Sequence, residues 1–161
     1  MGRRGTGNFS MDYPVRKRTR LKAYDYSQNG GYFVTICTKH RAPLFWNASG
    51  ELSHIGQIAL RCMEEIPAHI SGVFLDAHCI LPDHVHLILF LEHVGPPYMA
   101  ADRSKQTLSR TVQQFKGAVT RQSGQRAIWQ SGYYDHIIRS EQDLNEIRRY
   151  IQENPIKWGV Q

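Results

Sequence analysis

Residues 84–91 (HVHLILFL) constrain the fold more than any other part of the chain. This apolar segment follows the turn signal Pro82-Asp83 and is typical of a strand buried in a sheet. Side chains two positions apart project from the same face of a strand, so His84 and His86 are expected side by side. They are a candidate pair of metal ligands, although eight histidines placed at random would give roughly 0.4 His-x-His pairs.

The rest of the sequence predicts further strands and helices. Strands are expected at residues 32–38, 73–80, 84–91 and 133–139, and helices at residues 55–66, 105–121 and 140–154, the first stopped by Pro67 and the last by Pro155. This order predicts an α+β fold with a split β-α-β arrangement. We expect an antiparallel sheet with helices on one face, plus a C-terminal helix that carries Tyr150.

Length and composition predict one domain. A chain of 161 residues buries about two-thirds of its unfolded surface. Residues 16–161 are expected to form this domain, and the polar, Gly-rich residues 1–15 are expected to be disordered or added by cloning. Three cysteines without Cys-x-x-Cys spacing predict neither disulfides nor a zinc knuckle. No apolar segment of about 18 residues is present, so we expect no membrane span and a cytoplasmic location.

Positive charge is concentrated near the start of this domain. The net charge is +6, and five cations lie close together: Arg16, Lys17, Arg18, Arg20 and Lys22. Lys105 and Lys116 belong to a second basic set in the later half of the chain. Such sets attract a polyanion, and counterion release supplies the affinity for a nucleic acid. The alternative is a solvated terminal arm, but together the two sets favour nucleic acid over an acidic small molecule.

The last helix supplies groups that would complete a site around the histidines. Two neutral imidazoles and one oxygen ligand suit Mn²⁺ or a similar ion, which polarises a phosphodiester. Tyr150 and Asn154 are four residues apart and share a helix face. An ion held by His84, His86 and Asn154 would therefore lie close to the Tyr150 hydroxyl. The alternatives are an aromatic at the edge of the core for Tyr150 and a helix C-terminal residue for Asn154.

Five sets of residues, in a fixed order, make the interpretation more specific. They are residues 32–38 (YFVTICT), 81–88 (LPDHVHLI), 114–116 (QFK), 128–130 (IWQ) with 133–139 (YYDHIIR), and 150–155 (YIQENP). With these residues the chain resembles the HUH-type single-tyrosine transposases, and within them the REP-associated tyrosine transposases. The resemblance covers roughly residues 20–158, nearly the whole chain.

The resemblance implies a ferredoxin-like catalytic domain that acts on single-stranded or hairpin DNA. In this family the HUH histidines, matched here by His84 and His86, bind a divalent ion such as Mg²⁺ or Mn²⁺. The tyrosine of the late helix, matched by Tyr150, attacks the scissile phosphate and leaves a 5′-phosphotyrosine link and a free 3′-hydroxyl. Asn154 matches the third ligand, where many insertion-sequence members have glutamine.

Two further residues of the matched segments are candidates for DNA contact. His136, in the last expected strand, would contact DNA or lie next to the metal ligands. A histidine satisfied within the core is the alternative. Trp129 would stack on an unpaired base, and packing against other side chains is its alternative.

Two other functions stay open at this stage. One is a module that binds hairpin DNA or RNA without cutting it, and the other is a metal-dependent hydrolase in which His84 and His86 activate water. The sequence has no GxxxxGK[ST], GxSxG or HExxH motif, which argues against ATP-driven, serine acyl-transfer and zincin chemistry. The protein is expected to be a monomer or a homodimer, with Tyr150 acting in its own chain or in the partner.

Overall fold

The α+β fold expected from the sequence is confirmed. The structure is a computed structural model, and it describes residues 30–92 and 107–157. Its elements are β1 Gly30–Cys37, the 3-10 turn η1 Lys39–Arg41, α1 His54–Glu64, α2 Ile66–His69, β2 Val73–Leu81, β3 His84–Leu91, α3 Leu108–Ser123, β4 Tyr134–Ile138 and α4 Glu141–Lys157.

The four strands form one sheet in the order β2-β3-β1-β4, with every neighbouring pair antiparallel. This is the order of a split β-α-β fold, in which β3 lies between the strands that α1 connects. The register places His86 opposite Thr35 and His84 opposite Cys37. On the other side of β1, His136 lies opposite Phe33.

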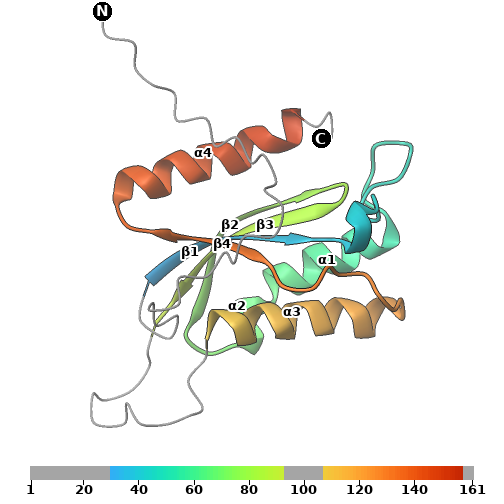
Figure 1. The fold of residues 1–161 in the computed structure, drawn as a ribbon, viewed down its shortest axis with the longest axis horizontal. Helices are drawn as coiled ribbons and strands as arrows, with labels where there is room; N and C mark the ends of the chain where they lie inside the picture. The colour runs from blue at the N-terminus through green and yellow to red at the C-terminus, as the bar shows by residue number, and fades with distance from the viewer. Residues whose placement is uncertain (1–29, 93–106, 158–161) are drawn as a thin grey trace, which may run out of the picture.

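Helices cover both faces of the sheet (Figure 1). Helices α1, α2 and α3 pack on the face to which β1 contributes Val34 and Ile36. Helix α4 lies on the opposite face, where Ile147 and Ile151 pack against Phe33 and neighbouring side chains of the sheet. The sequence grouped the first helices correctly on one face but did not assign a face to the tyrosine-bearing helix.

Two helix ends differ from the prediction. Helix α1 ends at Glu64, and Pro67, which was expected to stop it, lies in the first turn of α2, where proline is tolerated. Helix α4 continues through Pro155 to Lys157, so the prediction that it ends near Asn154 was wrong. A proline this close to the end removes one backbone hydrogen bond and leaves the preceding turns intact.

Strand β2 contains a β-bulge at Asp76. Leu75 lies opposite Leu89, while Ala77 lies opposite Ile88, so two steps along β2 correspond to one step along β3. As a result, Leu75 packs with the α1–α3 layer and Ala77 with the α4 layer.

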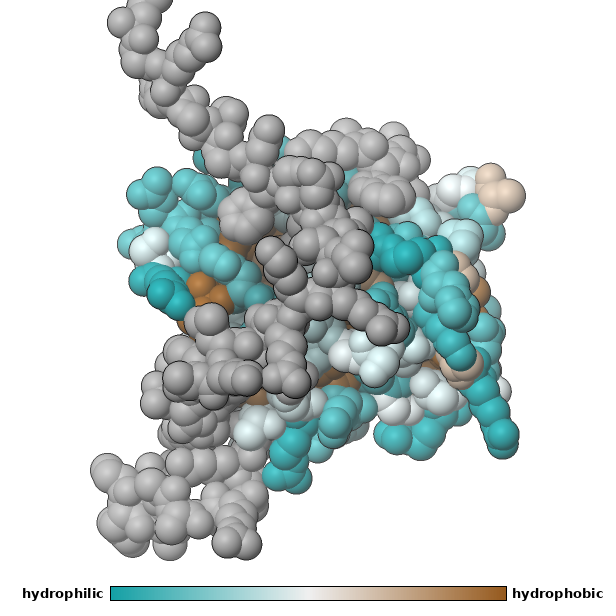
Figure 2. Space-filling view, viewed as in Figure 1, coloured by the Kyte–Doolittle hydropathy of each residue, from teal (hydrophilic) through white to brown (hydrophobic). Residues whose placement is uncertain are grey.

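Surface and cysteine features agree with an ordinary folded domain. Most of the described surface in view is hydrophilic, and apolar residues show only as small patches (Figure 2). Within the described ranges no helix is long and apolar enough to cross a membrane. All three cysteines are buried and free. The expectations for residues 1–15, for the cations of residues 16–22 and for Lys105 lie outside the described residues and stay predictions.

Candidate active site

The two histidines lie where the sequence placed them, at the start of β3. Both project from the sheet face that α4 covers, and their ring centroids are 4.7 Å apart. His84 is 1 % exposed and His86 is 0 % exposed. The site is therefore a buried pair of imidazoles beneath the helix that carries Tyr150.

A carboxylate and a guanidinium fix the orientation of His84. Nδ1 of His84 lies 2.6 Å from Oδ1 of Asp83, and the other carboxylate oxygen pairs with Nε of Arg41 at 3.0 Å. Burial raises the pKa of Asp83, but the hydrogen bond from His84 and the charge of Arg41 outweigh burial and hold that pKa below its usual value. Asp83 thus stays ionised and can accept a proton from Nδ1 of His84, and in that tautomer the Nε2 lone pair is available to a metal ion.

His86 presents a second lone pair in the same site. Its Nδ1 lies 2.8 Å from the Thr35 hydroxyl, and its ring stacks on Phe33 with centroids 5.1 Å apart. Burial lowers the pKa of His86 far below its usual value, and repulsion from His84 when that ring is protonated and from Arg41 adds to the shift, so the His86 ring is neutral. Nε2 of His86 is buried and has no hydrogen-bond partner among the described residues. An orphaned buried nitrogen of this kind fits a metal ligand.

Helix α4 brings Tyr150 to these histidines within one chain, and it also carries Asn154. The Tyr150 ring centroid is 5.5 Å from that of His86 and 6.0 Å from that of Phe33. Asn154, one turn further along, is 4 % exposed, and its Nδ2 has no hydrogen-bond partner in the described part of the chain. Asn154 lies in the last turn of α4, which ends at Lys157, so both its role as a ligand and the alternative of a helix C-terminal residue stay predictions.

These side chains fit a divalent ion with open coordination positions. No three His, Cys, Asp or Glu side chains gather as a metal site anywhere in residues 30–92 and 107–157. The protein ligands would therefore be His84, His86 and the amide oxygen of Asn154. Water or phosphate oxygens would fill the other positions of such an ion.

His136 lies on the same face of the sheet but is not part of the histidine pair. It is exposed, with 44 % of its side chain accessible, and its Nε2 is 2.9 Å from Oδ2 of Asp143 on α4. The alternative of a histidine satisfied in the core was therefore wrong. Contact between His136 and DNA stays a prediction.

Lys116 and Trp129 hold the segment that leads into β4. The Lys116 ammonium donates to the carbonyls of Gln130 at 2.9 Å and Gly132 at 2.5 Å. The Trp129 indole donates to the Lys116 carbonyl at 3.2 Å, and its ring packs against two phenylalanines of the α1–α3 layer. In the structure Trp129 is thus packed against other side chains. The DNA contacts expected of Lys116 and Trp129 stay predictions.

The residues that orient the histidines are not among those predicted from the sequence. The sequence predicts only a turn at Pro82-Asp83, although an acidic residue next to a His-x-His pair is itself a signal for an oriented ligand. Thr35 and Arg41 carried no such signal, because Thr35 reaches His86 only through the pairing of β1 with β3.

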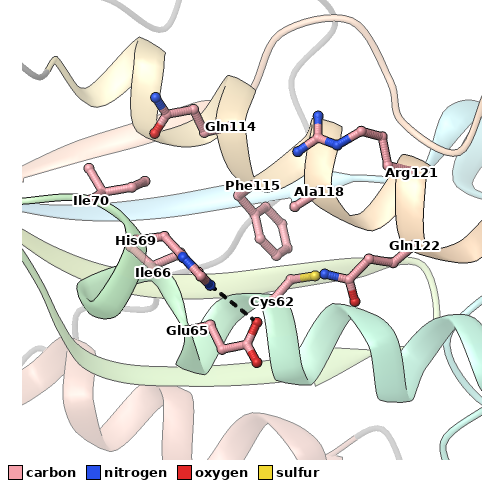
Figure 3. Close-up of a pocket in the computed structure, with 10 residues that line it drawn as sticks. All are labelled: Cys62, Glu65, Ile66, His69, Ile70, Gln114, Phe115, Ala118, Arg121 and Gln122. Carbon is pink, nitrogen blue, oxygen red and sulfur yellow. Dashed lines mark ion pairs between the residues drawn. The ribbon is translucent and has the colours of Figure 1, made fainter.

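A cavity of about 400 Å³ lies elsewhere, between α1, α2 and α3 (Figure 3). Its lining includes Phe115 and Ile66, and the ion pair of Glu65 with His69 lies at its edge. It is on the sheet face opposite Tyr150. None of the residues predicted for catalysis or metal binding lines it.

Comparisons with known proteins agree on a family. The family described as "Transposase IS200 like" matches residues 26–154. A Haemophilus influenzae protein described only as uncharacterized is 35 % identical over 171 residues, covering 95 % of each chain. The REP-associated tyrosine transposase of Escherichia coli is 23 % identical over 134 residues, covering 83 % of this chain and 71 % of that protein.

Similarity to a solved structure extends to the fold. A structure of a REP-associated tyrosine transposase bound to a REP hairpin has a TM-score of 0.64 and 23 % sequence identity. The match covers 87 % of this chain and 74 % of the other. At this level of identity the match supports the arrangement of the elements.

Proposed function

Because this chain belongs to the family of IS200-like transposases, we propose that it is a metal-dependent transesterase that nicks and rejoins single-stranded DNA. The observation that carries the proposal is the placement of Tyr150 over His86 within one chain, with ring centroids 5.5 Å apart. A tyrosine and a pair of oriented imidazoles at this spacing are the two parts that such a reaction needs.

The buried residues under α4 prepare a metal site. A divalent ion, Mg²⁺ or Mn²⁺, held by His84, His86 and Asn154 would polarise the scissile phosphate. Asp83 keeps the Nδ1 proton of His84 in place through its 2.6 Å hydrogen bond. The Thr35 hydroxyl lies 2.8 Å from Nδ1 of His86, and with the proton on that nitrogen the Nε2 lone pair of His86 is available to the ion.

Tyr150 is the proposed nucleophile. Its hydroxyl oxygen attacks the phosphorus and forms a new ester, while the bond from phosphorus to the 3′ oxygen breaks. The phenol loses its proton, and the leaving 3′ oxygen gains one. One phosphodiester replaces another, so the reaction needs no ATP, and the 3′-hydroxyl can reverse it. Positive charge near the Tyr150 hydroxyl would favour loss of its proton, because a phenol of unperturbed pKa about 10 must be deprotonated before it attacks.

The proposed substrate is DNA that contains a hairpin or palindrome. The support is the REP hairpin in the similar solved structure, together with the cations at Arg16, Lys17, Arg18, Arg20, Lys22 and Lys105. Cations at this density release counterions from a DNA backbone and add affinity that does not depend on sequence.

The test is formation of a covalent protein–DNA adduct. Wild-type protein, Mn²⁺ and a single-stranded palindromic oligonucleotide should yield an adduct that migrates slowly in a denaturing gel. Tyr150→Phe removes only the attacking oxygen and should abolish the adduct, and EDTA should do the same to the wild type. Tyr133→Phe is the matched control, because its hydroxyl contacts Ser109 in the opposite layer, and it should leave the adduct intact.

Other results would replace the proposal. Normal hairpin binding without cleavage in any divalent ion would favour a non-cleaving DNA or RNA binding module. Free product ends that are unchanged by Tyr150→Phe would favour a hydrolase in which the histidines activate water. Persistence of the adduct in Tyr150→Phe would reject this nucleophile.

A further inference from the structure

The β-bulge in β2 contains a carboxylate, that of Asp76, which pairs with a side chain of α4. Alternation along a regular strand would place residues 75 and 77 on one face and Asp76 on the other. The extra residue breaks this alternation, so Leu75 and Ala77 pack in opposite layers. Asp76 is freed from regular pairing and meets a side chain of α4.

The partner of Asp76 is Arg148, two residues before Tyr150. Nη2 of Arg148 lies 2.5 Å from Oδ1 of Asp76, and Nε lies 2.8 Å from Oδ2. Two parallel hydrogen bonds between a guanidinium and a carboxylate fix orientation as well as distance. The same guanidinium donates to Asn145 one turn earlier at 3.3 Å. The pair therefore fixes the helix that carries Tyr150 to strand β2.

A second polar contact holds α4 at the other edge of the sheet. Asp143, in the first turn, pairs with His136 of β4 at 2.9 Å and accepts the backbone N–H of Arg139 at 3.3 Å. Strands β2 and β4 are the two edge strands. Between these contacts α4 packs through Ile147 and Ile151. This apolar packing alone does not fix the rotation of α4 about its axis or its sliding along the sheet, whereas directional hydrogen bonds to both edge strands do.

We infer that Asp76 and Arg148 are positioning residues for Tyr150, acting through the placement of α4 rather than by contact with the reacting atoms. This inference rests on the proposed function, because it concerns the nucleophile of that reaction. An exposed ion pair contributes little to global stability. A small displacement of a reacting group, however, slows a reaction strongly. The effect of breaking the pair should thus appear in the chemical step.

The test compares two variants that break the same pair with opposite changes of charge. Asp76→Asn removes a negative charge, and Arg148→Met removes a positive one. At saturating hairpin DNA and Mn²⁺, each should slow adduct formation by about tenfold, and the double variant should be no slower than either. Arg148→Lys should recover part of the rate, because it keeps the charge but loses the two-pronged geometry.

Hydrogen exchange of the α4 amides gives a readout that needs no activity. Exchange should be faster in Asp76→Asn and in Arg148→Met, while the midpoint of thermal unfolding stays close to that of wild type. Glu146→Gln is the matched control. It weakens the hydrogen bond to Gln142 within the same helix without touching the sheet, and it should change neither the exchange nor the rate.

Two results would overturn the inference. Rate changes of opposite sign in Asp76→Asn and Arg148→Met would mean that the charges act on DNA directly. Unchanged exchange in α4 would mean that the pair does not hold the helix. If wild-type protein forms no adduct, the proposed function fails, and the exchange experiment still decides whether Asp76 and Arg148 fix α4.

Discussion

Cys79 lies next to the histidine site, and its chemistry reports on that site. It is the register partner of His86 on β2. Burial raises the pKa of its thiol to about 12, although a hydrogen bond with the His86 backbone opposes the shift. Because the thiolate is the reactive form, iodoacetamide at pH 8 should leave Cys79 unmodified in the native protein and modify it quickly in guanidinium. Mass spectrometry of a peptide digest measures both rates.

The same pKa gives stability a defined dependence on pH. An unfolded thiol loses its proton near the usual pKa of 9.0, whereas the folded one keeps it to about 12. The unfolded state therefore binds fewer protons between these values, and the free energy of unfolding should fall as pH rises from 9 to 12. If Cys79 were alkylated as fast in the native protein as in guanidinium, the prediction of a protected thiol would fail. Strand β2 would then separate readily from β3.

At the scale of residues, the sequence predicted the buried pair of histidines but not the groups that orient them. The placement of His84 and His86 on one face follows from the two-residue period that every strand has. Thr35 is 51 residues from His86 in sequence, and their contact depends on the register of β1 with β3. A shift of one residue would turn Thr35 to the other face, and the apolar pattern of β1 does not determine that shift.

Helix α1 depends on a glycine for its close contact with the segment before it. A Cβ added to Gly56 would lie 2.1 Å from the backbone carbonyl oxygen of Phe45, an atom that cannot move aside alone. Gly56→Ala should lower the free energy of unfolding by about 3 kcal/mol, at the upper end of the range for overpacking. Urea denaturation followed by circular dichroism measures the change.

A glycine of α3 provides the matched control with the opposite sign. The group nearest to a Cβ on Gly117 is the flexible end of Arg121, at 3.1 Å. Gly117→Ala should therefore stabilise the protein by up to about 1 kcal/mol through helix propensity. Equal effects of the two substitutions would contradict the close contact at Gly56.

At the scale of elements, the sequence located every strand of the sheet but not the irregularities. The bulge at Asp76 was invisible, because residues 73–80 are apolar enough to suit either face. The end of α4 was misplaced because proline was treated as a stop, whereas a proline in the last turn costs one hydrogen bond. Such details depend on tertiary contacts, among them the ion pair of Asp76 with Arg148.

For the whole molecule, the placement of Tyr150 over its own histidines predicts action within one chain. A mixture of Tyr150→Phe and His86→Ala should form no adduct, because neither chain has a complete site. Each variant is first shown to be folded by circular dichroism. If sites were shared between subunits, about one quarter of wild-type activity would return, since half of random dimers would be mixed and each would hold one intact site.

The fold class could be predicted because the order of elements admits few arrangements. The face chosen by α4 could not, since an apolar stripe on a helix shows only that the helix packs. What decides the face is that β1 and β3 are buried on both sides, so that two layers are needed to cover the sheet. The histidines face the layer that α4 forms.

The sheet therefore separates the candidate active site under α4 from the layer formed by α1, α2 and α3. Everything proposed to touch DNA phosphate at the histidines lies on one side, while the cavity between α1, α2 and α3 lies on the other. Gln122, exposed at the rim of that cavity, can carry a fluorescent dye through an engineered cysteine. Such a dye would follow the protein on DNA in single-molecule experiments without entering the candidate active site.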